Sequence, residues 1–525
     1  LSNLIERYGC VAGYPNGTFK GGQAMTRWEA AALLNACLDR ITEVTDELKR
    51  LMKEFEKELA VLKGRVDSLE AKVGELEATQ FSTTTKLKGL ATFVLGANSF
   101  SGSNSSGALF STTPNTTAFN QANYGATTFN YDVRLNFDTS FTGKDLLRTT
   151  LRAANAGGAN GSAYGSGGLA QMEAFFEQPA GDNVIGVNRL FYNFPMGDQL
   201  SLNAGAMVRV DDAGMLGIWP SVYPADTVLD FFTYAGAPGA YNLNGLGAGA
   251  GFVWSPKGIK GLTISQNYVS ANGGAFTSGS TSVTSNAGSG NPQYGGVWTN
   301  GSGGVAVSQI GYAGEKTPLI GGSYAIAFAY TYSQNVALPS GTPLAQAYSD
   351  YNNANGGYSS GNNYGLSGYW KPEKAGLIPS FSWGFGGGSY NVGNVGSSTT
   401  ATKGITIASW SVGMQWDDAF IKGNALGMGV GQAPFVTQRG SMAANTPGSA
   451  TAAANGGGQT GSYDSNYSWE WWYKFQVTDN ISITPAIYYI SNYNGQLGTQ
   501  NLNVGSNSPA ANNLFGGLLK TTFKF

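Results

Sequence analysis

The sequence predicts an all-β transmembrane barrel of about 16 antiparallel strands, preceded by a small α-helical module and a long coiled-coil helix. From Gln80 to Phe525 the chain repeats runs of about ten residues in which apolar and polar side chains alternate. The connections between these runs are alternately short and long, as in outer-membrane barrels. Residues 41–76 instead carry apolar side chains at the spacing of a coiled coil.

The composition separates two regions and excludes several classes of protein. The chain has 525 residues, 77 Gly and no His. Residues 1–80 hold 11 of its 30 Lys and Arg and 13 of its 32 Asp and Glu. Because histidine is absent, the common general base and transition-metal ligand are missing, and we expect neither an enzyme nor a metal or cofactor site. A net charge of −2 gives no indication of a nucleic-acid partner.

The first forty residues contain a turn followed by a helix start, Gly13-Tyr14-Pro15-Asn16-Gly17-Thr18-Phe19 and Thr26-Arg27-Trp28-Glu29. Thr26 and Glu29 have the spacing of a helix capping box. The motif resembles an S-layer-homology (SLH) repeat, with Asn16 where that family has Asp and Trp28 where it has Ala. The resemblance implies that residues 1–40 form a partial SLH module that binds peptidoglycan-linked polysaccharide through Tyr14, Arg27 and Glu29. For Glu29, helix capping alone is an equal explanation.

Both cysteines, Cys10 and Cys37, lie in this module. In an exported protein such a pair predicts a disulfide, while two reduced thiols in the packing remain the alternative. A metal site would need more ligands than two thiols.

Residues 41–79 form the predicted coiled-coil stalk. Its apolar positions follow one another at intervals of three and four and are Ile41, Val44, Leu48, Leu51, Phe55, Leu59, Leu62, Val66, Leu69, Val73 and Leu76. A stripe this narrow predicts self-association, because a single helix would otherwise need an equally long partner surface. The pattern is compatible with a dimer or a trimer.

Residues 80–525 form the predicted barrel. In the clearest run, residues 128–141, Phe129, Tyr131 and Val133 share one face, and Asn130, Asp132 and Arg134 share the other. The alternation predicts strands at 86–96, 128–141, 145–155, 187–195, 199–210, 246–255, 262–270, 304–312, 322–335, 361–371, 379–390, 404–416, 422–432, 466–477, 480–491 and 513–525. A soluble sandwich or propeller is the alternative, but it gives no reason for the alternating connection lengths.

The connection lengths also predict the orientation of the barrel. Outer-membrane barrels have short periplasmic turns and long outer loops, so both the stalk and Phe525 are expected on the periplasmic side. A wall-binding module has to lie on that side. The two predictions therefore agree.

The predicted lumen carries a cluster of charges. The lumen-facing bases lie in the second to fifth predicted strands and are Arg134, Arg148, Arg152, Arg189 and Arg209. The third long connection carries Asp211, Asp212, Asp226 and Asp230. We expect these nine residues to line a constriction, with the acids facing the arginines. Small inward residues such as Ala325, Gly384 and Gly386 are interpreted as leaving room for water.

An SLH repeat, a coiled coil and a Gly-rich barrel containing Val477-Thr478-Asp479-Asn480-Ile481 follow one another in this chain. This order resembles the cyanobacterial SLH porins, which are relatives of the carbohydrate-selective OprB porins. The resemblance implies a trimeric porin in the outer membrane that is tethered to peptidoglycan and passes inorganic ions and small solutes by diffusion. The terminal Phe525 resembles the signal that the barrel-assembly machinery reads. A structural anchor between membrane and wall, and a carbohydrate-selective or iron-passing channel, remain alternatives.

Overall fold

The computed structural model divides into two compact units, Leu1–Thr83 and Thr84–Phe525. In the first unit it describes Trp28, Arg50, residues 53–66 except 59, and residue 68. In the second unit it describes residues 84–525, with gaps at 103–116, 157–168, 177–181, 225–227, 244–245, 275–295, 300–301, 318–320, 337, 339–340, 343–344, 346–358, 393–401, 439–465 and 494–511.

The described part of the first unit is helical between residues 53 and 66, apart from a bend at Phe55. Val66, on the predicted seam, is exposed. This helix covers only part of the predicted stalk, so the long coiled coil stays a prediction. Tyr14, Arg27, Glu29, Cys10 and Cys37 lie outside the described residues. Among the helices that the structure describes, none is both long and apolar enough to cross a membrane.

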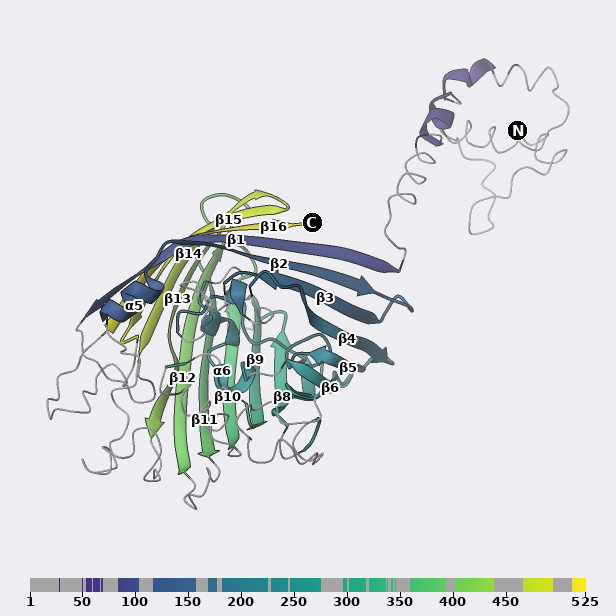
Figure 1. Ribbon diagram of the computed structural model, residues 1–525. Helices are drawn as coiled ribbons and strands as arrows, with labels where there is room; N and C mark the ends of the chain where they lie inside the picture. The colour runs from purple at the N-terminus through teal and green to yellow at the C-terminus, as the bar shows by residue number, and fades with distance from the viewer. Residues whose placement is uncertain are drawn as a thin grey trace, which may run out of the picture. The chain divides into compact units, whose positions relative to one another are not determined.

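The second unit is a closed barrel of sixteen antiparallel strands, which confirms the predicted fold (Figure 1). The strands are β1 (Thr85–Gly102), β2 (Thr128–Thr139), β3 (Leu146–Ala154), β4 (Gly186–Met196), β5 (Leu200–Val208), β6 (Gly247–Trp254), β7 (Leu262–Ser270), β8 (Gly304–Gly314), β9 (Ser323–Gln334), β10 (Ser359–Lys371), β11 (Ser380–Val392), β12 (Thr402–Asp417), β13 (Ala425–Gln438), β14 (Tyr467–Thr478), β15 (Ile481–Ser491) and β16 (Asn512–Lys524). Each pairs with its sequence neighbours, so a sandwich or propeller is excluded.

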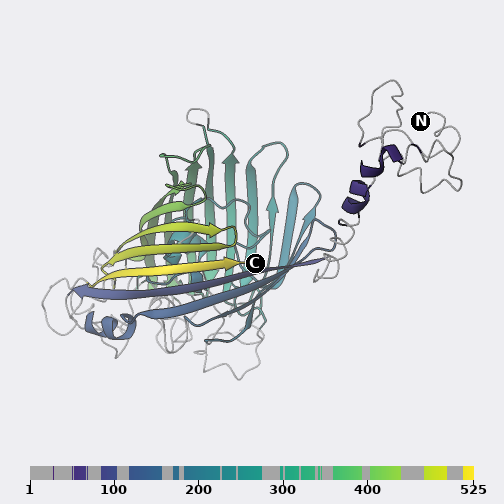
Figure 2. The same cartoon turned by 90° about the horizontal axis from the view of Figure 1, so that it is seen from above.

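The barrel closes between its first and last strands, which lie side by side in Figure 2. Leu90 pairs with Lys524, and the register continues to Gly102 opposite Asn512. Phe525 extends this seam, since its backbone exchanges hydrogen bonds with Gly89 at 2.6 and 3.1 Å. A Cβ at Gly89 would lie 2.2 Å from the Phe525 ring, so glycine is required for this close approach.

Alternation along the strands separates an apolar outer face from an inner face. On β9 the side chains of Ile326, Phe328 and Tyr332 are exposed, whereas Ala327 and Thr331 between them are buried. The same pattern exposes Phe93 and Leu95 on β1 and Phe515 and Leu519 on β16. Large apolar side chains exposed in a continuous band are typical of a lipid-facing surface.

Among the described residues of this unit, four short helices lie between the strands: α5 (Thr117–Tyr124), η1 (Glu173–Phe175), η2 (Asp230–Tyr234) and α6 (Pro238–Tyr241). α6 contacts β9, β10, β11 and β13, so it lies inside the ring of strands (Figure 1). Residues of η1 and η2 pack with inward side chains of β1, β14, β15 and β16 in one buried apolar cluster. The inside of the barrel is therefore partly occupied by its own loops.

Candidate functional site: the inside of the barrel

The described part of the third long loop, residues 209–224 and 228–243, crosses the inside of the barrel and is hydrogen-bonded to its wall. Side chains of five strands donate to its backbone carbonyls. These bonds run from Asn267 of β7 to Val210 and Met215 (2.9 and 3.0 Å), from Gln309 of β8 to Ile218 (2.8 Å), from Thr331 of β9 to Ala240 (2.7 Å), from Ser367 of β10 to Ala235 (2.6 Å) and from Ser409 of β12 to Gly236 (3.0 Å). Bonds to so many strands fix the course of the loop along the wall.

Glycines in the wall let this loop lie flush against it. A Cβ at Gly384 would lie 1.8 Å from the Ala235 carbonyl oxygen, and one at Gly386 would lie 2.9 Å from the Ala237 Cα. Ala329 packs in one buried cluster with Ala237 and Tyr241. The interpretation that Gly384 and Gly386 leave room for water is therefore wrong, because the third loop occupies the space beside both of them.

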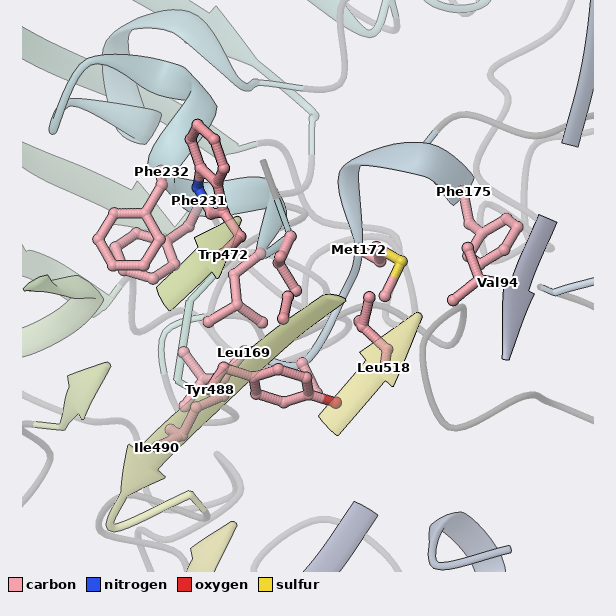
Figure 3. Close-up of a cluster of buried hydrophobic side chains, with 14 of the residues drawn as sticks. Val94, Leu169, Met172, Phe175, Phe231, Phe232, Trp472, Tyr488, Ile490 and Leu518 are labelled. Carbon is pink, nitrogen blue, oxygen red and sulfur yellow. The ribbon is translucent and has the colours of Figure 1, made fainter. Parts of the chain in front are cut away.

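The second long loop meets the third loop inside the barrel through its described residues 169–176. Met172 and Leu229 form an isolated antiparallel bridge. The Glu173 N–H donates to the Val228 carbonyl at 3.2 Å, and the Asp230 N–H donates to the Gln171 carbonyl at 2.9 Å. Figure 3 shows the apolar side of this junction, where Phe175 lies beside Val94, and Phe231 and Phe232 lie beside Trp472.

Two of the predicted arginines hold the second loop. Arg152 of β3 is 2% exposed and binds Asp132 at 2.6 Å. It also donates to the carbonyls of Phe176 and Ala174, the latter at 3.0 Å. Arg134 of β2 binds Asp132 at 2.7 Å and reaches the same Ala174 carbonyl at 3.1 Å. Both guanidinium groups are thus engaged by one carboxylate and by the loop backbone.

The other three arginines are paired with carboxylates as well. Arg148 of β3 makes two bonds to Asp138 of β2, at 2.8 and 3.0 Å. Arg189 of β4 binds Asp212 at 2.9 Å. These pairs lower the net positive charge that the sequence alone assigns to this wall.

Arg209 differs from the prediction in its location. β5 ends at Val208, so Arg209 begins the third loop instead of belonging to the strand. It binds Asp211 at 2.8 Å, and its guanidinium lies 4.6 Å from the centre of the Phe176 ring. It therefore connects the second and third loops.

The acids of the third loop are only partly placed against the arginines. Asp211 and Asp212 pair with Arg209 and Arg189, whereas Asp226 lies outside the described residues. Asp230 is buried and accepts a hydrogen bond from the Tyr234 hydroxyl at 3.0 Å. Burial, followed by the neighbouring charge of Glu173, raises the pKa of Asp230 well above its ordinary value. Burial likewise raises the pKa of Asp212, against the opposing effect of Arg189.

Four polar residues at the junction were missed by the sequence analysis. Glu470 of β14 accepts hydrogen bonds from Tyr223 and from the Leu229 backbone, and Glu173 and Lys520 line the same recess as Arg209. Lys520 lies on the inner face of β16. The sequence could have indicated two of them, because Glu470 and Lys520 are charged residues at inward positions of alternating strands. It gives no such indication for the loop residues Glu173 and Tyr223.

A recess of about 420 Å³ lies between the two loops and β16. Charged groups of both signs line it, together with the aromatic side chains of Trp219, Tyr223 and Tyr234. Within the described residues no group of His, Cys, Asp and Glu has the arrangement of a metal site. The site therefore presents mixed charge and aromatic surface to a solute.

Two protein-family profiles match this chain, and together they cover most of it. The profile described as "Carbohydrate-selective porin, OprB family" matches residues 43–525, and that described as "S-layer homology domain" matches residues 3–31. The chain belongs to the OprB family of porins. It is an outer-membrane porin with a periplasmic SLH domain for anchoring to the cell wall, which confirms the predicted family, location and function.

Two relatives match this porin over nearly its whole length, and a third matches a short part of it. An uncharacterized protein of Nostoc sp. is 32% identical over 567 residues, covering 100% of this chain and 82% of the relative. One of Synechocystis sp. is 30% identical over 522 residues, covering 94% and 84%. The outer membrane protein SlpA of Deinococcus radiodurans is 37% identical over 81 residues, or 14% of this chain and 7% of SlpA. The high-pH structure of Pseudomonas putida OprB superposes with a TM-score of 0.49 at 11% identity, covering 86% of this chain and 96% of that one.

Proposed function

We propose that small hydrophilic solutes and inorganic ions diffuse through a constriction bounded by the second and third loops and by the arginine-bearing wall of β2–β4. The single observation that carries this proposal is the third loop, which crosses the barrel while hydrogen-bonded to five strands. A loop fixed in this way narrows the bore to a defined aperture. The nine predicted residues then act as two groups: the arginines with their carboxylates, and the loop acids.

The charge pairs determine what kind of selectivity we propose. Arg134 and Arg148 keep 26% and 30% of their side-chain surface exposed, while Arg152 is enclosed. The exposed pair is therefore available to passing solutes, and Arg152 acts through the loop that it holds. Since Asp132 and Asp138 lie beside the exposed guanidinium groups, the wall favours orientation of dipolar solutes over strong anion selection.

Ion selectivity in planar bilayers tests this assignment. In the double variant Arg134→Ala/Arg148→Ala, Asp132 and Asp138 keep their charge without these partners, so the reversal potential in a salt gradient should shift toward cation preference. Lys257→Ala, in a turn where both Lys257 and its partner Asp198 are largely exposed, is the matched control and should leave the potential unchanged. An unaltered potential in the double variant would remove these arginines from the constriction.

A second proposed function is that of a tether, which the SLH match at residues 3–31 supports. In this proposal Tyr14, Arg27 and Glu29 contact the wall polysaccharide, and a Cys10–Cys37 disulfide stabilises the module. The seam of residues 41–79 assembles three chains. Phe525 presents the assembly signal to the barrel-assembly machinery.

Co-sedimentation with purified peptidoglycan sacculi tests the tether. The full chain should sediment with sacculi that retain their polysaccharide, and Arg27→Ala should weaken this binding. Lys20→Ala, a charge change in the same module outside the motif, is the control. Equal binding of both variants would place the contact elsewhere in the chain.

The physiological solute is to be identified by transport measurements on the purified channel. The family description names carbohydrate selectivity, and the recess offers three aromatic side chains beside its charges. Liposome swelling with neutral sugars and with zwitterionic or charged solutes of equal size separates the two possibilities. Equal rates at equal size favour the general porin that we propose, whereas faster entry of sugars favours the carbohydrate-selective alternative.

A further inference from the structure

We propose that Glu470 of β14 is the positioning residue that sets the width of the constriction, because it fixes the junction of the second and third loops to the wall. This inference rests on the proposed porin function and deepens it. Glu470 is fully buried and lies on the inner face of its strand, between Ser468 and Trp472. A carboxyl group at such a position needs several hydrogen-bond donors to offset the loss of water.

Glu470 accepts hydrogen bonds from the third loop on both of its carboxylate oxygens. The Tyr223 hydroxyl donates to Glu470 Oε1 at 2.6 Å, and the Leu229 N–H donates to Glu470 Oε2 at 2.8 Å. One side chain of the wall thus holds two points of the loop that are six residues apart. A glutamine offers one acceptor oxygen in place of two, so it cannot reproduce both bonds.

The wall around Tyr223 is shaped to receive it. A Cβ at Gly413 of β12 would lie 2.3 Å from the Tyr223 ring, and one at Gly429 of β13 would lie 2.9 Å from its hydroxyl oxygen. Trp472 stacks on Tyr223 with ring centres 6.1 Å apart and donates its Nε1 hydrogen to the Tyr223 hydroxyl at 3.2 Å. These contacts bring the hydroxyl to Glu470, so the interaction is specific to this tyrosine.

The anchored point lies at the junction of the two loops. Leu229, whose N–H binds Glu470, forms the bridge with Met172 of the second loop. The second loop is held two residues further on, where Arg134 and Arg152 bind the Ala174 carbonyl. A continuous series of hydrogen bonds therefore runs from β2 and β3 through both loops to β14. Removing Glu470 frees one end of this series while leaving the arginine end intact.

Single-channel recording of the full-length protein tests the proposal. In Glu470→Gln and Glu470→Ala, losing a hydrogen bond to a buried carboxylate should raise the fraction of time spent in a wider conductance level by on the order of tenfold. Ser468→Ala is the matched control, because Ser468 lies on the same strand and face and its hydroxyl contacts Asn466 instead of the loop. It should conduct like the wild type.

A redox-reversible variant separates loop release from damage to the barrel. Tyr223→Cys/Gly413→Cys, in a Cys10→Ser/Cys37→Ser background, removes the tyrosine but allows a disulfide from loop to wall. The Cβ built at Gly413 lies 2.8 Å from the Tyr223 Cβ, so a shift of about 1 Å reaches disulfide geometry. The reduced form should conduct like Glu470→Gln, and the oxidised form like the wild type.

The outcomes distinguish this inference from the proposed function. If the wild type forms no channels, the proposed diffusion through the constriction fails. If the wild type conducts, and both Glu470 variants and both redox states conduct identically to it, Glu470 does not set the aperture and the inference is overturned.

Discussion

The two sides of the inner wall hold the loops by opposite means. On β2–β4, arginine side chains reach inward and bind Asp132, Asp138 and the carbonyls of the second loop. On β10–β13, glycines such as Gly384 and Gly429 place no side chain between the strands and the third loop, so the loop packs directly against the strand backbone. One porin wall thus holds its inner loops with long charged side chains on one side and with glycines on the other.

The difference has a physical reason. A guanidinium group reaches several ångströms from its strand and donates to loop carbonyls there, so the loop backbone need not touch the wall backbone on the arginine side. A glycine surface allows backbone to approach backbone, so that side is closely packed. We therefore expect the glycine side to respond to steric changes and the arginine side to changes of charge and hydrogen bonding.

The largest effect is expected from adding a side chain on the glycine side. In Gly384→Val the new atoms occupy the position of the Ala235 carbonyl oxygen, which lies 1.8 Å from the built Cβ, so the third loop must move from the wall. Single-channel conductance should change severalfold relative to the wild type, because the loop defines the aperture. In Gly387→Val, the matched control on the same strand, the built Cβ has the Ile407 oxygen 3.8 Å away as its nearest neighbour. Equal conductance of the two variants would break the comparison.

A smaller effect, on stability, is expected from the arginine side. Arg152→Ala removes one of the two arginines that bind Asp132, a carboxylate that is only 1% exposed. Breaking this buried ion pair should destabilise the barrel by about 3–5 kcal/mol. Arg148→Ala, at a pair that is partly exposed, should cost clearly less. Urea unfolding in lipid bilayers measures both. A larger loss in Arg148→Ala than in Arg152→Ala would contradict the assignment of Arg152 as the residue that holds the loop.

The smallest effect is expected in the turn at the foot of the arginine side. The Thr142 hydroxyl, and after it the Thr142 N–H and the Tyr192 and Ser140 hydroxyls, hold the pKa of Asp145 far below its ordinary 3.8. Because the folded pKa is the lower one, the stabilisation is complete above pH 3.8 and is lost as the pH falls toward the folded pKa.

Thermal unfolding in detergent measures this contribution. Asp145→Asn should unfold at a lower temperature than the wild type at pH 7, and the gap should narrow as the pH drops below 3.8. Asp198→Asn, which removes a largely exposed turn carboxylate, serves as the control. A gap that stayed constant down to pH 2 would show that charge at Asp145 is not what stabilises the turn.

The barrel itself could be predicted from the sequence because alternation is a local property. β7 was predicted with its observed bounds, Leu262–Ser270. β13 extends to Gln438, beyond its predicted end at 432, through a stretch with register shifts against β12 that interrupt the alternation. Strand identity is therefore encoded locally, whereas bulges depend on the neighbouring strand.

The site could be predicted only in part, because it depends on contacts between distant segments. The inward arginines follow from the strand period, but the pairing of Arg148 with Asp138 and of Arg152 with Asp132 depends on the register of β2 against β3. From the sequence, the missing side chain of Gly384 suggests an open space in the barrel. In the folded protein the third loop occupies that space. Glu470 and Tyr223 are 247 residues apart, so no local pattern connects them.

The central claim is that the barrel encloses a water-filled bore whose width is set by the third loop. Single-channel conductance of the purified wild type, recorded with polyethylene glycols of graded size, tests it most directly. We predict stable channels in which small polymers lower the conductance and larger ones are excluded at a sharp size, with Gly384→Val moving that size and Gly387→Val leaving it in place. Absence of channels, or a size limit identical in all three proteins, would contradict the claim.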